Sequence, residues 1–259
     1  MNHWNIYHVP EQSFRHCVFG DLHLLVLNIG PEWRIHSFCS GCDLESLPAT
    51  GPEAILCDSL PWKRFDRDTT HEATVTLRPS FPLQPIVARP ASSLTLAPGS
   101  SALFYLAVPP QVDIEVPHSS GSLKIDSIPI DRLTKTWHGT KSYGKTCLSL
   151  RSPARRRYKH PDHGSHNILV PIDLVNRLRT PFSFDRLYLE TGHFGIFRHG
   201  DQLFSNAARL RIEKEDRDRN ALAYTPRPIS PHEDAEELTP PRDGRARRSF
   251  LENAFSSLF

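Results

Sequence analysis

Short apolar runs, each closed within a few residues by glycine or proline, are the feature that most constrains the fold of this chain. Segment 15–38 shows the pattern, because its apolar and polar residues alternate and Gly20-Asp21 and Gly30-Pro31 interrupt it. Alternation with a period of two is typical of strands with one buried face, and glycine at the first turn position suits a tight hairpin. The sequence therefore predicts three antiparallel strands in this segment.

The same pattern continues through most of the chain. A strand, a Pro98-Gly99 turn and a second strand follow one another between residues 94 and 108. Turn signals about every ten residues favour a sandwich or barrel, and the 23 prolines oppose long helices. We therefore predict an all-β, antiparallel, immunoglobulin-like β-sandwich, as one sandwich or as two sandwich-like halves. The other strand-like segments are 73–77, 86–88, 112–116, 123–130, 147–150, 168–176, 182–189, 196–197, 203–204 and 208–212.

Composition divides the chain into four parts. Residues 1–72 are expected to form a β-hairpin region and an irregular loop that pack on the main sandwich domain, 73–212. Residues 213–248 are charged and proline-rich, and such a segment buries too little apolar surface to offset its conformational entropy. We predict a disordered linker there, followed by a short amphipathic segment, 249–259.

Charge and cysteine content exclude several classes of protein. The chain has 31 basic and 29 acidic residues, whereas a dedicated nucleic-acid-binding domain has a clear basic excess. Its five cysteines do not match a small disulfide scaffold and predict free thiols in a reducing compartment. The first residues lack a signal-peptide pattern, and no apolar run of about 18 residues occurs. We expect a cytoplasmic protein without a transmembrane segment, with at most weak peripheral membrane contact.

The densest run of polar, aromatic and basic side chains lies between residues 128 and 158. Arginine binds phosphates and carboxylates through paired donors, and an exposed tryptophan can stack on a base or a guanidinium group. The simpler interpretation is a solvated loop with a core tryptophan, because charge runs are usually solvated. The residues of this candidate binding surface are Lys135, Trp137, His138, Lys145, Arg151, Arg155, Arg156 and Arg157, with Lys141 and Lys159 beside them.

Residues 139–146, GTKSYGKT, match the spacing of a phosphate-binding loop. Such a loop works where a strand meets the start of a helix, whose backbone N–H groups bind the phosphates. Residues 147–150 look like a strand instead, and Pro153 leaves no room for a helix. We therefore expect a strand-connecting loop, and nucleotide binding is the alternative.

Metal and catalytic motifs are incomplete. Cys39 and Cys42 have the spacing of a zinc knuckle, which Cys57 and His36 could complete. The usual second cysteine pair is missing, so free thiols in a loop are the simpler interpretation. No Gly-x-Ser-x-Gly motif occurs. We assign no catalytic residue, metal ligand or cofactor. Proline and glycine separate three further histidines, which therefore cannot align on a helix: His160, His163 and His166.

The segments 135–139, KTWHG, and 144–151, GKTCLSLR, resemble the core of the family known as domain of unknown function 432. The Pro98-Gly99 strand pair is similar in kind, and the resemblance covers residues 80–212. The family has no established activity, so the resemblance implies no catalytic residue. Its genes are sometimes found beside those of mechanosensitive channels, which implies a membrane channel or complex as one candidate partner.

The last eleven residues are apolar again, after the polar linker. Ser249 can cap a helix, with Glu252 three residues later, and such a helix would present its apolar side chains to a groove. Folding back onto its own domain is the alternative. The residues of this predicted partner-docking segment are Phe250, Leu251, Phe255, Leu258 and Phe259.

These features predict a non-enzymatic binding or accessory module that acts through a protein partner. The alternative is a phosphate- or nucleotide-binding protein that uses residues 139–146 and the adjacent arginines. A weak nucleic-acid binder that uses residues 151–159 is a third interpretation.

Overall fold

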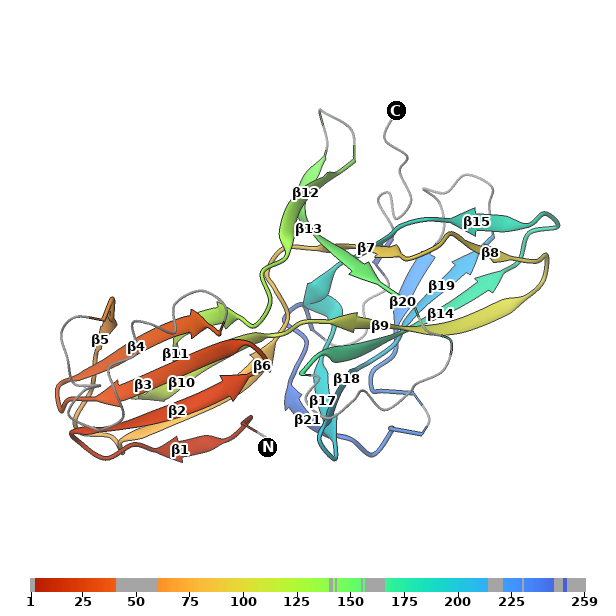
Figure 1. Ribbon diagram of the computed structural model, residues 1–259. Coiled ribbons are helices and arrows are strands. Elements are labelled where there is room, and N and C mark those ends of the chain that lie inside the picture. Colours follow the sequence, from red (N-terminus) through yellow and green to blue (C-terminus); the bar gives the residue numbers. More distant parts are fainter. Residues whose placement is uncertain are drawn as a thin grey trace. The chain divides into compact units, whose positions relative to one another are not determined.

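The computed structural model contains almost exclusively β-structure, as predicted (Figure 1). Among the residues that it describes, Thr191–His193 form a short 3-10 turn and no α-helix occurs. The chain divides into two compact units: unit 1 is Met1–Ser80 with Gln111–Asp131, and unit 2 is Phe81–Pro110 with Arg132–Phe259. The described residues are 3–40, 60–139, 142, 144–154, 156, 166–213, 221–229, 231–244 and 249–250.

Unit 1 contains two four-stranded antiparallel sheets. The strands predicted in segment 15–38 are present, and Gly20 joins the first two with a φ of 61°. The first sheet, in spatial order, is β1 (Ile6–His8), β6 (Thr74–Ser80), β10 (Gln111–His118) and β11 (Gly121–Pro129). The second is β2 (Ser13–Phe19), β3 (Leu22–Asn28), β4 (Glu32–Cys39) and β5 (Lys63–Asp66).

β6 of the first sheet and β4 of the second bury apolar side chains at alternate positions. Trp33 and Ile35 of β4 are each 1% exposed, and Ile114 of β10 is fully buried. An ion pair between Lys63 of β5 and Asp126 of β11, at 2.8 Å, links the two sheets. Alternation of this kind is what a layered β-structure with one inner face per sheet requires.

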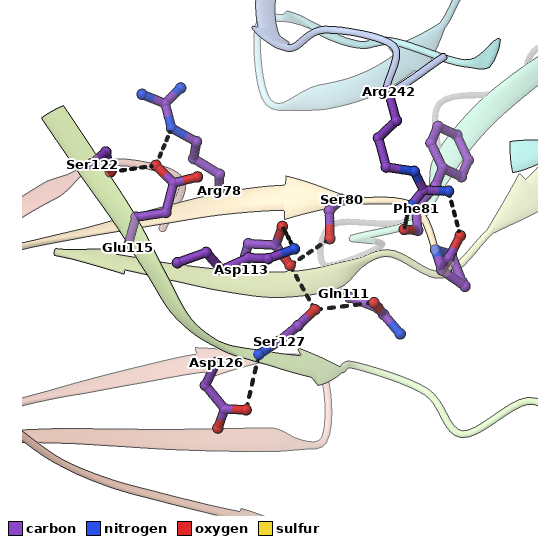
Figure 2. A network of polar contacts seen from close by, with 12 residues as sticks. Arg78, Ser80, Phe81, Gln111, Asp113, Glu115, Ser122, Asp126, Ser127 and Arg242 are labelled. Atoms are coloured by element: carbon purple, nitrogen blue, oxygen red, sulfur yellow. Dashed lines mark hydrogen bonds and ion pairs between the residues drawn. The ribbon is translucent and has the colours of Figure 1, made fainter. Parts of the chain in front are cut away.

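One buried carboxylate ties three strands of unit 1 together (Figure 2). Asp113 Oδ1 accepts hydrogen bonds from Ser80 Oγ at 2.7 Å and Ser127 Oγ at 2.6 Å. Lys124 Nζ donates to Asp113 Oδ2 at 3.1 Å. A carboxylate that is 8% exposed needs such donors, because burying it without them would cost several kcal/mol.

Unit 2 contains an eight-stranded mixed sheet with β14 in its interior. β14 pairs with β9 along one edge and with β18 and β19 along the other. The pairings with β18 and β19 are parallel, whereas we predicted antiparallel strands. The strands of this sheet are β9 (Ser101–Val108), β14 (Ile168–Asn176), β17 (Ile196–His199), β18 (Gln202–Ser205), β19 (Ala208–Ile212), β20 (Ala221–Tyr224), β21 (Glu236–Thr239) and β22 (Ser249–Phe250).

Two smaller sheets complete unit 2. A third parallel pairing joins β7 to β13. One small sheet is, in spatial order, β12 (Thr134–His138), β13 (Lys145–Ser152), β7 (Ile86–Pro90) and β16 (Leu187–Leu189). The other is β15 (Phe182–Phe184) with β8 (Leu94–Leu96).

The units differ from the predicted domain boundary at residue 73. β10 pairs with β6 over five residues, so segment 111–131 belongs with the N-terminal strands although residues 81–110 intervene. The sequence pattern shows that each strand exists, but it contains no signal for a partner that lies so far along the chain.

The predicted linker, 213–248, also differs from the structure where it is described. β20 pairs with β19 and β21 pairs with β17, so both extend the large sheet. Main-chain pairing and arginine contacts keep this polar segment folded. Neither kind of contact can be deduced from composition. Ser249 and Phe250 form a strand against β20, so no helix begins at Ser249. Residues 251–259 lie outside the described part of the chain.

Candidate binding surface on strands β12 and β13

Five of the six candidate binding residues that are described lie on the strands of one hairpin, and Arg156 follows its second strand. Lys135, Trp137 and His138 lie on β12, and Lys145 lies on β13 opposite His138. β13 pairs with β7 only from Leu148 onward, so the outer part of the hairpin has no third strand beside it. Figure 1 shows β12 and the start of β13 extending past β7. The fold therefore brings these residues together on an extended hairpin.

Trp137 lies at the outer end of the hairpin and is 44% exposed, so it is not the core residue of the simpler interpretation. Its indole packs against Gly144, where an added Cβ would lie 2.1 Å from Trp137 Nε1. Gly144 is thus required by the packing of this tryptophan. Gly144 is one of the two glycines that give residues 139–146 the spacing of a phosphate-binding loop. Its presence is explained by the packing of Trp137 and not by phosphate binding.

His138, on the opposite face of the hairpin, anchors it to unit 2. Its ring is 6% exposed and stacks on Tyr188 of β16, with ring centroids 4.6 Å apart. Tyr188 donates to Glu190 Oε1 at 2.9 Å, and Lys145 Nζ lies 3.5 Å from the same oxygen. Burial, followed by the hydrogen bond to Glu190, raises the pKa of Tyr188 well above its ordinary value. Glu190 and Tyr188, which sequence reasoning missed, thus hold the last residue pair before the loop, His138 and Lys145, on the rest of unit 2.

The strand-connecting interpretation of residues 139–146 agrees with the structure. β12 ends at His138, and β13 begins at Lys145 where a phosphate-binding loop would start a helix. The amide groups of β13 pair with β12 and β7, and Lys145 pairs with Glu190. These groups are therefore engaged within the protein.

Arg151 lies at the other end of β13, next to an arginine that sequence reasoning missed. Arg89 of β7 is its register partner in the parallel pair, so both side chains are on the same face of the sheet. They line a groove of about 620 Å³ together with Asp185 and with Pro90, Ala91, Ser152 and Pro153. Of the other predicted arginines, Arg156 is exposed, whereas Arg155 and Arg157 lie outside the described residues.

The predicted zinc-ligand candidates are only partly described. Cys39 is a half-buried free thiol, and Cys17 and Cys147 are buried free thiols. Cys42, Cys57, His160 and His163 lie outside the described residues. Where side chains are described, no group of three or more histidine, cysteine, aspartate or glutamate residues could hold a metal ion.

No helix in the described segments is long and apolar enough to cross a membrane.

These features define an all-β protein with two compact units and a basic, aromatic hairpin. A family model described as "Protein of unknown function (DUF432)" matches residues 3–259, and the chain belongs to this family. The resemblance predicted for residues 80–212 is confirmed, and it extends over nearly the whole chain. Comparisons with the curated proteins and with the solved structures found no match.

Proposed function

We propose that this chain is a non-enzymatic binding module that acts through a protein partner, with the outer part of the β12–β13 hairpin as its docking surface. The observation that carries the proposal is the 44% exposure of Trp137 on a hairpin whose opposite face is held by the stacking of His138 on Tyr188. Tryptophan is the residue most typical of binding hot spots, because it buries a large area at a small entropic cost.

The surroundings of Trp137 support this use. The indole packs on Gly144, and His138 stacks on Tyr188, so the paired strands of the hairpin are held in place before a partner arrives. Such preorganisation reduces the entropy lost on binding. Lys135, two residues before Trp137 on β12 and therefore on the same face, is exposed and would favour an acidic rim on the partner.

A capture experiment tests the hairpin. The full-length protein and its Trp137→Ala variant are used to capture partners from cells of its source, and the partner identified is then titrated with both. We expect affinity to fall about tenfold or more, the usual loss at a hot spot. Leu83→Ala is the matched control, because Leu83 is 73% exposed in the same unit. Equal affinity of the Trp137 variant and the wild type would refute this docking surface.

The C-terminal residues 251–259 are a second docking element in this proposal. The argument is compositional: three apolar residues, Leu251, Phe255 and Leu258, recur at helical spacing, with Phe259 at the end. Deleting residues 251–259 should leave the Tm of the protein within about 2 °C, the usual scale of surface changes, and should weaken partner capture. A large drop in Tm would show that the segment instead stabilises its own domain.

Nucleotide binding is the function from which the proposal must be distinguished. Titration of ATP with magnesium into the wild type and the Lys145→Ala variant makes this distinction. We expect no micromolar binding that depends on Lys145, because β13 occupies the place of the helix. Micromolar binding that Lys145→Ala abolishes would replace the proposed function.

A further inference from the structure

We propose that the groove at the ends of β7 and β13 binds the phosphate group of a small molecule, with Arg89 and Arg151 as its ligands. The groove encloses about 620 Å³, which lies within the usual range of small-molecule sites. It is separate from the outer hairpin residues of the proposed docking surface, so neither proposal depends on the other.

The two arginines are placed side by side by strand register. Arg89 and Arg151 are partners in the parallel pair, and adjacent strands lie about 4.8 Å apart. Like charges that face each other across strands are unfavourable. Both side chains are exposed, and neither forms an ion pair within the described residues. A bound anion would relieve the repulsion between them.

The acidic residue in the groove is already balanced. Asp185 Oδ1 lies 3.4 Å from Arg186 Nε, and this ion pair offsets the charge of the carboxylate. The two groove arginines therefore dominate the local charge. The carboxylate of Asp185 is 62% exposed, and its oxygens can accept hydrogen bonds from a hydroxyl group of the ligand.

The floor and rim of the groove are held in shape by the backbone. Ala91 N donates to Ser152 O at 3.1 Å and continues the pairing beyond the end of β7. Ala154, immediately after Pro153, has a φ of 45°, a conformation that residues other than glycine rarely adopt. Backbone in such conformations is found disproportionately at ligand sites. The groove is thus formed before a ligand binds.

Donor number favours phosphate over carboxylate. Each guanidinium group carries five N–H donors in a planar fork, and a fork binds two oxygens at once. Two neighbouring forks would use all four acceptor sites of a carboxylate, whereas a terminal phosphate presents three oxygens and a charge of about −1.5 to −2, which matches two guanidinium groups. The class of ligand that fits is therefore a phosphate monoester with a hydroxyl group within reach of Asp185.

Calorimetric titration of the full-length protein at low salt tests this site, with inorganic phosphate, glycerol phosphate, acetate and a single-stranded oligonucleotide as probes. We expect saturable binding with one site per chain, with glycerol phosphate bound more tightly than inorganic phosphate and acetate bound most weakly. Arg89→Gln and Arg151→Gln should each weaken glycerol phosphate binding about tenfold or more, because each removes charged hydrogen bonds.

Two controls keep the result specific. Arg179→Gln removes the same charge from an exposed arginine of unit 2 outside the groove lining, and it should change affinity less than about twofold. Arg151→Lys keeps the charge but loses the fork and should also weaken binding. Non-saturable binding of glycerol phosphate would overturn the proposal, and so would a loss of affinity in Arg179→Gln equal to that in the groove variants. Tighter binding of the oligonucleotide than of glycerol phosphate through Arg89 and Arg151 would also overturn it.

Discussion

Arg242 Nη1 donates to the carbonyl oxygen of Phe81 at 2.9 Å, across 161 residues of sequence (Figure 2). Its Nη2 donates to Pro82 O at 2.9 Å and to Thr191 Oγ1 at 3.0 Å, and Thr191 donates in turn to Pro82 O at 2.7 Å. One side chain from the segment expected to be disordered thus joins the first residues of unit 2 to the turn after β16. Segment 236–244 is therefore part of the folded structure of unit 2.

Arg242→Ala should lower the stability of unit 2 by about 1–2 kcal/mol, because three hydrogen bonds to a charged donor are lost at a partly solvated site. Thermal unfolding should show a decrease in Tm of a few degrees. Arg179→Ala removes an exposed arginine of the same unit and should leave Tm nearly unchanged. Equal Tm values for Arg242→Ala and the wild type would mean that water replaces these bonds without loss.

Asp113 should be the most sensitive polar residue of unit 1. Asp113→Ala leaves the hydroxyl of the buried Ser80 without its acceptor and removes the partner of Lys124. We expect a loss of about 2–3 kcal/mol in the free energy of unfolding, measured by urea denaturation. Glu72→Ala, which removes an exposed carboxylate from the same unit, is the control. A loss within about 0.5 kcal/mol would show that the network contributes little to stability.

Local structure was predictable where one strand and its turn are contiguous. Leu94–Leu96, the Pro98-Gly99 turn and Ser101–Val108 follow the sequence pattern closely, because apolar periodicity and a positive φ at Gly99 are local properties. In the hairpin that presents Trp137, the strand-like segment 147–150 was predicted for the same reason, but no strand was predicted at residues 134–138, which form β12. The exposure of the Trp137 indole was not predictable, because it depends on contact with Gly144.

Pairing between distant strands was not predictable from the pattern. Arg89 and Arg151 are neighbours only because β7 pairs in parallel with β13, and nothing in either segment encodes that register. The same limit explains the missed strand β21. Three of its four residues, Glu236, Glu237 and Thr239, are charged or polar, and they form a strand by pairing with β17, where Arg198 also contacts Glu236. Composition predicts disorder for such a segment when its partner is unknown.

A histidine pair on the outer face of β2 and β3 should make unit 1 sensitive to acid. His16 Nε2 lies 3.0 Å from His23 Nδ1, a contact that requires one ring to donate and the other to accept. Burial, followed by repulsion from His23, lowers the pKa of His16 below its ordinary value. Between that lowered pKa and the ordinary value of about 6.5, the unfolded chain binds more protons than the folded protein. Stability should therefore fall as pH decreases through this window.

Urea denaturation at pH 7.5 and pH 5.5 measures this loss. His16→Gln should reduce the difference between the two pH values, because glutamine does not titrate. His8→Gln is the control, since His8 is exposed on β1 of the same unit. An unchanged pH dependence in the His16 variant would assign the acid sensitivity to other groups.

Gly144→Ala should disturb the hairpin although alanine usually stabilises relative to glycine. Where alanine can adopt the backbone conformation, this exchange raises the free energy of unfolding by about 0.4–1 kcal/mol, because alanine restricts the unfolded chain. Here the new Cβ would lie 2.1 Å from Trp137 Nε1 and 2.2 Å from Cε2, so the indole must move. Overpacking of this kind costs about 1–3 kcal/mol. We expect a net loss of stability, greater quenching of tryptophan fluorescence by acrylamide, and weaker binding of the partner.

A double-mutant cycle with Trp137→Ala separates the causes: Gly144→Ala should be neutral or stabilising once the indole is gone. If the exchange is equally destabilising in both backgrounds, the backbone at residue 144 requires glycine, and the packing of Trp137 is not the reason.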